Sequence, residues 1–253
     1  MDPVLEVNNL GIDFGGLTAV NNLNMEVYPH EIVGLIGPNG AGKTTVFNML
    51  TKVYEPSRGS ILLNGQDIAK MNTVEVNKAG VARTFQNIRL FADLSVIDNV
   101  KSGMNNLYQY SVLDTLLHTA KRNDNEKKIN EKAEELLKIF NLHESKDIEA
   151  SSLPYGAQRR LEIARALATD PKLLLLDEPA AGMNPQETEE LMNTIRFVRD
   201  QFDIAILLIE HDMSLVMNIC ERIYVLNYGM LLAKGSPDEI KNDERVIKAY
   251  LGD

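Results

Sequence analysis

Residues 31–50 have the sequence EIVGLIGPNGAGKTTVFNML. The apolar run at residues 32–36 predicts a buried strand, and the apolar positions after residue 45 predict a helix. The turn between them, residues 37–44, fits the P-loop pattern of a glycine, four residues and then Gly-Lys-Thr. Glycines let successive backbone N–H groups converge on one anion, and the new helix adds its positive dipole end. This stretch therefore predicts a site for a nucleoside triphosphate.

Two side chains of the turn have chemistry of their own. Lys43 can reach the β- and γ-phosphates of a nucleotide, and the Thr44 hydroxyl can ligate Mg²⁺. A glycine turn can also arise by chance. A strand directly before it and a helix directly after it are, however, the context that a P-loop requires.

Composition excludes several other classes of protein. The chain has 253 residues, of which 44% are hydrophobic and 25% charged, as in an ordinary soluble globular protein. A net charge of −10 argues against nucleic acid as a partner, since phosphate backbones require a basic surface. Cys220 is the only cysteine, so no disulfide can form within the chain. The N-terminus lacks the apolar region of a signal peptide, and the apolar runs are too short to cross a bilayer.

The order of strand and helix signals predicts an α/β fold. Alternating residues at 4–7, 10–14 and 23–27 predict short strands, which with the Asn64-Gly65 turn indicate an N-terminal antiparallel β layer. Ser236, Pro237 and Glu239 predict a capping box at the start of a short helix. Strand signals vanish at 87–165, where helical periodicity dominates, and buried-strand patterns resume afterwards. We therefore expect one catalytic domain whose core comprises residues 1–86 and 166–253, with a helical subdomain inserted at 87–165.

Two later strand ends place polar groups on the edge of the predicted sheet. Leu173 to Leu176 form a fully apolar run that ends at Asp177 and Glu178, and the apolar run at 204–209 ends at Glu210 and His211. Ligands bind at the carboxyl ends of the strands in open α/β sheets. Asp177 is then placed to hold Mg²⁺, and Glu178 to accept a proton from the attacking water. A neutral His211 could touch the γ-phosphate.

Five ordered motifs resemble those of ABC-type ATPases over essentially the whole chain. They are Gly37 to Thr44 (Walker A), Gln86 (Q-loop), Leu153 to Arg160 (signature), Asp177-Glu178-Pro179 (Walker B) and His211 (H-loop). The variants DEPAAGMNP at 177–185, IEHDM at 209–213, RTFQNIRLF at 83–91 and the ending AYLG at 249–252 are similar to the ATP-binding subunit, of the G type, of branched-chain amino acid importers. The resemblance implies a P-loop core of the RecA-like class.

The resemblance also assigns roles to single positions. It implies that Glu178 is the general base, that His211 senses the γ-phosphate and that Phe14 stacks on adenine, although spacing alone favours Phe14 as a half-buried strand residue. Thr44, Gln86 and Asp177 would surround Mg²⁺. The residues expected to hold ATP are Phe14, Gly37, Pro38, Asn39, Gly40, Ala41, Gly42, Lys43, Thr44, Thr45 and Gln86.

The resemblance implies several partners. Each signature motif would cap the ATP of the opposite subunit in a dimer, which is expected to be a heterodimer with a paralogous subunit. Residues 85–91 would contact an integral membrane permease at the cytoplasmic face of the cell membrane, and an extracytoplasmic binding protein would deliver the substrate. Nucleic acid is not an expected partner.

The signature departs from the family pattern Leu-Ser-Gly-Gly-Gln. This chain has Leu153, Pro154, Tyr155, Gly156 and Ala157, so the serine hydroxyl and one backbone N–H are absent. The backbone of Gly156 and Ala157 at a helix N-terminus remains an anion site. We therefore hypothesise that ATP is held more weakly by this half of the dimer. Asn184, where the family often has Asp, is a second departure.

Two alternative functions differ from amino acid import. One is an ABC ATPase with another cargo, such as lipopolysaccharide export, which the IEHDM segment and the C-terminal ending disfavour. The other is a switch module that binds ATP without driving transport, which the presence of both Glu178 and His211 disfavours. A small-molecule kinase is disfavoured because residues 87–165 show no acceptor-binding lid.

Overall fold

The structure, a computed structural model, describes residues 2–107 and 120–251. The chain divides into two compact units. The core unit comprises Met1–Gln86 and Lys172–Asp253, and the helical unit comprises Asn87–Pro171. The helical unit ends at Pro171 rather than at residue 165, because the helix that carries the signature continues to Leu167. Part of the predicted helical segment, residues 108–119, and Gly252 of the C-terminal ending lie outside the described residues.

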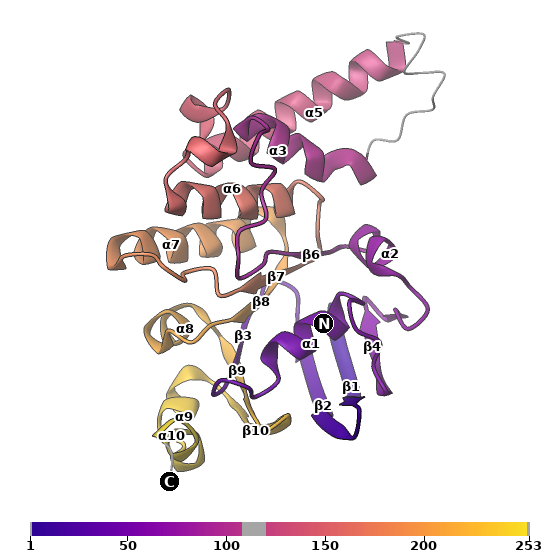
Figure 1. Ribbon diagram of the computed structural model, residues 1–253, viewed down its shortest axis with the longest axis vertical. Helices are drawn as coiled ribbons and strands as arrows, with labels where there is room; N and C mark the ends of the chain where they lie inside the picture. Colours follow the sequence, from indigo (N-terminus) through magenta and orange to yellow (C-terminus); the bar gives the residue numbers. More distant parts are fainter. Residues whose placement is uncertain (1, 108–119, 252–253) are drawn as a thin grey trace. The chain divides into compact units, whose positions relative to one another are not determined.

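A six-stranded sheet with the order β10-β9-β3-β8-β7-β6 forms the centre of the core unit (Figure 1). Its strands are β3 (Ile32–Ile36), β6 (Val81–Arg83), β7 (Leu173–Asp177), β8 (Ala205–Ile209), β9 (Arg222–Asn227) and β10 (Met230–Gly235). Every strand pair is parallel except β9 with β10. All residues of β3, β7 and β8 are buried, which explains their uninterrupted apolar sequences. The chain segments after these three strands leave the sheet at the same edge.

The predicted N-terminal β layer is confirmed as a four-stranded antiparallel sheet with the order β2-β1-β4-β5. Its strands are β1 (Leu5–Phe14), β2 (Leu17–Val27), β4 (Arg58–Leu63) and β5 (Gln66–Asp67). The two short strands expected before residue 15 form one strand, β1, with a shift of register between Val7 and Leu10. Asn9 has a φ of 49° at this irregularity. The break in apolar alternation therefore marks a β-bulge within one strand.

Helices of the core unit lie on both sides of the six-stranded sheet (Figure 1). They are α1 (Lys43–Leu50), α2 (Thr73–Lys78), α7 (Pro185–Phe202), α8 (Met213–Ile219), α9 (Pro237–Lys241) and α10 (Glu244–Leu251). Val46, Phe47, Met49 and Leu50 of α1 belong to a hydrophobic core that includes residues of both sheets. The first helix after the glycine turn is thus fixed in position by packing on two sheets.

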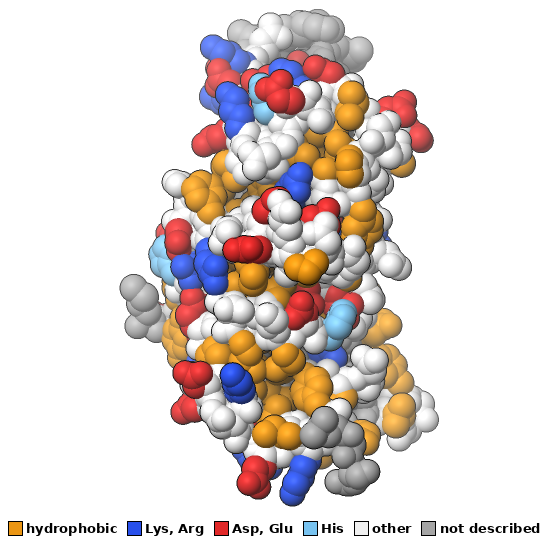
Figure 2. Space-filling model, turned by 90° about the vertical axis from the view of Figure 1, so that its left-hand side faces the viewer, with side chains coloured by type: hydrophobic (Ala, Val, Ile, Leu, Met, Phe, Trp, Pro, Cys, Tyr) orange, Lys and Arg blue, Asp and Glu red, His pale blue; other side chains and the backbone are white. Residues whose placement is uncertain are grey.

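Hydrophobic side chains gather on one face of the core unit, over α8, α9 and α10 (Figure 2). The capping box predicted at the start of α9 is confirmed, since Ser236 accepts from Glu239 N and the Glu239 carboxylate accepts from Ser236 N. In residues 2–107 and 120–251, no helix is both long enough and apolar enough to span a membrane.

The helical unit contains three α-helices among its described residues. They are α3 (Val96–Gly103), α5 (Ala120–Ile139) and α6 (Tyr155–Leu167), with short 3-10 turns η1 (Met104–Asn106), η2 (His143–Ser145) and η3 (Ala150–Ser152). The predicted apolar face of α5 is confirmed at Ala133, Leu136 and Leu137, which are buried. The helix begins at Ala120, earlier than its apolar pattern indicates, because its first turns carry charged rather than apolar residues.

Candidate active site

The turn between β3 and α1 has the backbone geometry that glycine allows. Gly37, Gly40 and Gly42 have φ angles of 149°, 78° and 103°. A Cβ atom would lie 2.1 Å from the carbonyl oxygen of Leu226 if placed on Gly37, and 2.9 Å from that of Ala19 if placed on Gly42. Gly37 and Gly42 are therefore required both by their dihedral angles and by close packing against the neighbouring strands, and Gly40 by its dihedral angle alone.

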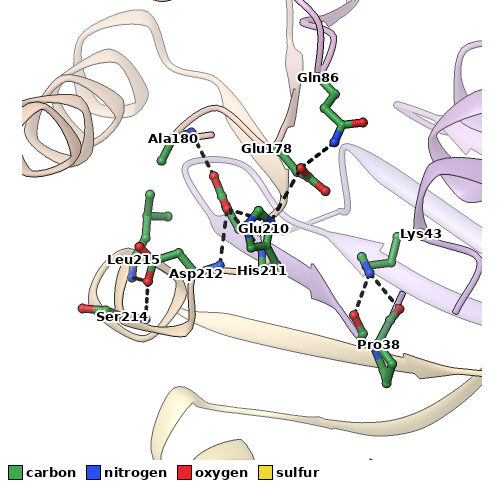
Figure 3. A network of polar contacts seen from close by, with 11 residues as sticks. Pro38, Lys43, Gln86, Glu178, Ala180, Glu210, His211, Asp212, Ser214 and Leu215 are labelled. Carbon is green, nitrogen blue, oxygen red and sulfur yellow. Dashed lines mark hydrogen bonds and ion pairs between the residues drawn. The ribbon is translucent and has the colours of Figure 1, made fainter. Parts of the chain in front are cut away.

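Lys43, the first residue of α1, folds its side chain back over the turn (Figure 3). Its Nζ donates to the carbonyl oxygens of Gly37 at 2.6 Å and Pro38 at 3.0 Å. Burial lowers the pKa of this ammonium group, while the nearby Glu178 and Asp177 carboxylates act in the opposite direction. A buried cation with only neutral carbonyl partners is well placed to exchange them for phosphate oxygens.

A cavity of about 440 Å³ opens along the turn and the start of α1. It is lined by Asn39 to Thr45, together with Glu178 from the end of β7. The sequence did not reveal its remaining walls, which are formed by Leu17, Thr18, Ala19 and Tyr228. These residues belong to β2 and to the β9–β10 turn, so only the folded sheet order brings them beside the P-loop.

Phe14 lies near the cavity in sequence but does not line it. It is the last residue of β1, is 43% exposed, and its ring makes an edge-to-face contact with Tyr54 at a centroid distance of 5.3 Å. Leu17 occupies the cavity wall at this side. Stacking of Phe14 on adenine stays a prediction.

Glu178 is the centre of a polar cluster at the end of β7 (Figure 3). Its Oε2 accepts a hydrogen bond from Gln86 Nε2 at 2.8 Å, and His211 Nδ1 lies 3.6 Å from the same oxygen. Glu178 has a φ of 47°, an unusual value for a residue with a Cβ, and its backbone N–H donates to the carbonyl of Ile209. Three of the predicted site residues therefore meet in the core unit, and local backbone strain aims the glutamate at the other two.

A second glutamate, Glu210, lies buried beneath this cluster (Figure 3). Its carboxylate accepts the backbone N–H groups of Ala180 at 2.9 Å, His211 at 3.1 Å and Asp212 at 3.5 Å. Burial raises the pKa of Glu210, and these N–H donors act to lower it. Glu210 thus ties the segment after Glu178 to the segment that carries His211. The sequence signal for this role was an acidic residue directly after the buried run at 204–209.

Asp177 is the third predicted acidic group of the edge, and it is buried. Thr44 at the start of α1 and Gln86 complete the predicted set of magnesium ligands. Among residues 2–107 and 120–251, no three His, Cys, Asp or Glu side chains gather to form a metal site of their own. One carboxylate, one hydroxyl and one amide fit Mg²⁺, which keeps water and phosphate oxygens as its other ligands. The donor set therefore suits a metal that arrives with a nucleotide.

The predicted signature residues lie at the start of α6 in the helical unit. Pro154 is the N-cap residue and is exposed, as is Tyr155, whereas Gly156 and Ala157 are buried. No side chain caps this helix end. Behind it, the buried Arg159 pairs with Glu162 at 2.8 Å and donates to the Tyr155 hydroxyl at 3.4 Å. The exposed start of α6 can therefore offer an anion little besides backbone groups.

The glycine turn, the buried Lys43 and a cavity lined by Glu178 form the site of a P-loop nucleoside triphosphate-binding protein. The Glu178 carboxylate lies beside the Gln86 amide and the His211 imidazole. The chain belongs to the ABC transporter family, whose family model matches residues 20–181. A second model, for branched-chain amino acid ATP-binding cassette transporters, matches residues 230–253.

Individual proteins are similar to this chain over nearly all of its length. The high-affinity branched-chain amino acid transport ATP-binding protein LivG of Escherichia coli K12 is 49% identical over 99% of this chain and 98% of its own. The lipopolysaccharide export system ATP-binding protein LptB of Acidithiobacillus ferridurans is 37% identical over 100% of this chain and 98% of its own. A crystal structure of an ATP-binding cassette of an ABC transporter in its ADP conformation has a TM-score of 0.87 and 28% identity, covering 100% of both chains.

Proposed function

We propose that this chain is the ATP-hydrolysing subunit of a membrane importer for branched-chain or related hydrophobic amino acids. The observation that carries the proposal is the Glu178 carboxylate, which Gln86 and His211 hold at the cavity that Lys43 also lines. The identity of 49% to LivG supports the choice of cargo, and the lower identity of 37% to LptB makes lipopolysaccharide export the weaker alternative.

Hydrolysis needs a phosphate cradle, a metal and a group that activates water. On binding ATP, Lys43 exchanges the carbonyls of Gly37 and Pro38 for phosphate oxygens, and the N–H groups at the start of α1 complete the cradle. Magnesium, when bound, neutralises charge that develops on the phosphate oxygens, and Thr44, Asp177 and Gln86 are the residues that would hold it. Glu178 takes the proton of the attacking water, and His211 contacts the γ-phosphate.

The working form is a dimer of ATPase subunits. The cavity at the P-loop is open to solvent in the single chain, and a closed site excludes water that would weaken its electrostatic interactions. The α6 N-terminus of a second subunit, at Pro154 to Ala157, supplies the cover. A paralogous partner with a complete signature would form the stronger of two unequal sites, so the dimer is proposed to be a heterodimer.

A permease in the membrane docks on the segment that follows Gln86. Phe91 is 52% exposed, although its backbone N–H and carbonyl are fixed by the side chain of Asn99. Arg165 also stacks on its ring, with the guanidinium 5.4 Å from the ring centre. An exposed aromatic ring on a rigid backbone is a suitable contact for a short helix of a membrane protein at the cytoplasmic face. An extracytoplasmic binding protein would deliver the amino acid to that permease.

The test is reconstitution in vesicles with the proposed permease subunits and binding protein. We expect leucine, isoleucine or valine, presented with the binding protein, to raise the ATPase rate. Phe91→Asp is expected to abolish this stimulation while the isolated chain keeps its nucleotide affinity. Phe197→Asp, which alters an exposed aromatic residue of α7 that does not line the P-loop cavity, is the control for added surface charge.

The outcomes separate the candidate functions. Stimulation by a branched-chain amino acid supports the proposal. Stimulation only by a lipid-linked sugar substrate would indicate export, and ATP binding with no turnover in any complex would indicate a switch module. Either of the latter two results overturns amino acid import as the function.

A further inference from the structure

Asp177, the predicted magnesium ligand, is paired with a buried arginine, Arg83, to which neither the resemblance nor the proposed mechanism assigns a role. Arg83 is the last residue of β6, whose neighbour in the sheet is β7. Its Nη2 donates to Asp177 Oδ2 at 2.8 Å, and the two side chains are 6% and 5% exposed. The carboxylate expected to hold the metal is thus engaged by a fixed cation within the core unit.

The guanidinium of Arg83 is held on its other sides by the P-loop helix. Its Nη1 donates to Asn48 Oδ1 of α1 at 2.7 Å and lies 3.4 Å from the hydroxyl of Thr51. The group also packs over the rings of Phe47 and Phe85, at 5.5 and 5.0 Å from their centres. Arg83 therefore connects the end of β7 with the C-terminal half of α1, the helix that starts at Lys43.

A gain in folding stability does not explain the buried ion pair between Arg83 and Asp177. Removing two charges from water costs about as much as their attraction returns, so a buried ion pair is weak evidence for stabilisation. The Nε of Arg83 has no hydrogen-bond partner among the described residues, which adds to the desolvation cost. A role in the site accounts for the pair better, because carboxylates that bind metals are commonly oriented by a hydrogen-bonded neighbour.

We propose that Arg83 is a positioning residue for the magnesium-nucleotide complex. By holding Oδ2 of Asp177 it fixes the orientation of the carboxylate and leaves Oδ1, which has no hydrogen bond to any described residue, for the metal's ligand shell. The same guanidinium couples this orientation to α1 through Asn48. The inference rests on the proposed function only in requiring that the chain binds a magnesium nucleotide.

A second pair in the core unit is built in the same way and serves as the control. Arg222 on β9 pairs with Glu31 at 2.7 Å, lies over the rings of Tyr28 and Tyr224, and also has an Nε without a partner among the described residues. It lies at the beginning of β9, which is parallel to β3, and so at the edge opposite the P-loop. Its loss should disturb folding as the loss of Arg83 does, without touching the metal ligands.

The test measures the affinity for ADP by calorimetry, once in excess magnesium and once in EDTA. The ratio of the two dissociation constants isolates the contribution of the metal from general loss of structure. In Arg83→Met the magnesium-dependent gain should fall by roughly 10-fold to 100-fold, the effect of removing such a neighbour from a metal ligand. Asn48→Ala, which keeps the ion pair but loosens it, should show a smaller fall. Arg83→Lys should restore part of the gain. Arg222→Met should leave the ratio unchanged.

Each outcome decides the proposal. An unchanged ratio in Arg83→Met, or an equal fall in Arg222→Met, shows a structural role only and overturns it. A larger gain with magnesium in Arg83→Met shows that the arginine competes with the metal, which overturns it as well. If Arg83→Met does not fold, Asn48→Ala and Arg83→Lys still give the ratio. A wild-type chain that binds no ADP at all would refute the proposed function instead.

Discussion

The N-termini of α1 and α6 differ from those of the other α-helices whose caps are described. Helices α2, α3, α7, α8 and α9 each begin after an Asn, Ser or Asp whose side chain accepts a hydrogen bond from the first turn. Helices α1 and α6 begin after Gly42 and Pro154, and no side chain caps them. An uncapped first turn leaves backbone N–H groups without intrahelical partners, available to an anion. The two exceptions are the two helices that the motifs assign to phosphate.

The two uncapped ends are nevertheless unequal. At α1 a glycine loop surrounds the anion position, and Lys43 adds a buried cation. At α6 the buried Arg159 is paired with Glu162, and the exposed residues at the helix start are Pro154 and Tyr155. Under the proposed function we therefore expect α1 to bind nucleotide within one chain, and α6 to contribute to the nucleotide site of a second subunit.

The largest expected effect separates nucleotide binding at α1 from hydrolysis. Glu178→Gln keeps the shape of the side chain but removes the base, so the ATPase rate should fall by roughly 10²- to 10⁴-fold. Affinity for ATP should change little, because the Glu178 side chain makes its polar contacts with Gln86 and His211 and no hydrogen bond with the P-loop residues, all of which the structure describes. Steady-state phosphate release and calorimetry measure the two quantities. A variant that hydrolyses ATP at the wild-type rate would remove Glu178 from the mechanism.

The next effect tests the cation at α1. Lys43→Ala should weaken ATP binding by roughly 10-fold to 100-fold, because a hydrogen bond to a charged group contributes about 1.5–3 kcal/mol. Lys52→Met is a matched control, since Lys52 is a second buried lysine of the core unit, bonded to the carbonyl of Ala69 and to Glu55. It should lower the melting temperature and leave ATP affinity unchanged. Equal losses of affinity in both variants would show that Lys43 acts through folding alone.

The residues proposed for the α1 half of the site can be placed on one sheet edge from the sequence, because their determinants are contiguous. Gly37 to Thr44 carry their own backbone requirements, and Asp177, Glu178 and His211 each directly follow or lie close to a fully apolar strand. Parallel strands place such ends on one edge, so a one-dimensional pattern was enough to bring them together.

Other parts of the site depend on contacts between distant segments and could not be predicted. Leu17 and Tyr228 line the cavity because β2 and the β9–β10 turn pack beside the P-loop, and neither position carries a motif. The sequence distinguishes Arg83 only as the first residue of the segment 83–91. Its role is not visible there, because its partners Asn48 and Asp177 are remote in sequence. The strand pair expected before residue 15 merged into β1, because a bulge at Asn9 interrupts the alternation without ending the strand.

A smaller effect is expected where the α6 end is made more like the family pattern. Pro154→Ser adds a hydroxyl and a backbone N–H, which should strengthen ATP-driven dimerisation by roughly 3-fold to 10-fold, the effect of one added hydrogen bond. Dimerisation is measured by sedimentation of the Glu178→Gln protein, alone and with its paralogous partner, in the presence of ATP, and the ATPase rate is measured with Glu178 intact. Pro154→Ala restores the N–H without the hydroxyl and separates the two contributions. If Pro154→Ser changes neither dimerisation nor the ATPase rate, the α6 end is not the weaker half.

The smallest expected effect concerns α7, whose N-terminus is capped by a side chain, in contrast to the uncapped N-termini of α1 and α6. Asn184 caps α7: its side chain accepts from Glu187 N at 3.0 Å, and the Glu187 carboxylate accepts from Asn184 N at 3.0 Å. Asn184→Ala should therefore cost about 1 kcal/mol of stability and lower the melting temperature by about 2–4 °C, whereas Asn184→Asp should retain the cap. Thermal melts measure both. Because the first turn of α7 is satisfied within its own chain, ATP-driven dimerisation should not change in either variant. A selective loss of dimerisation in Asn184→Ala would mean that a capped N-terminus also takes part in the composite site, and would break the distinction between open and capped helix ends.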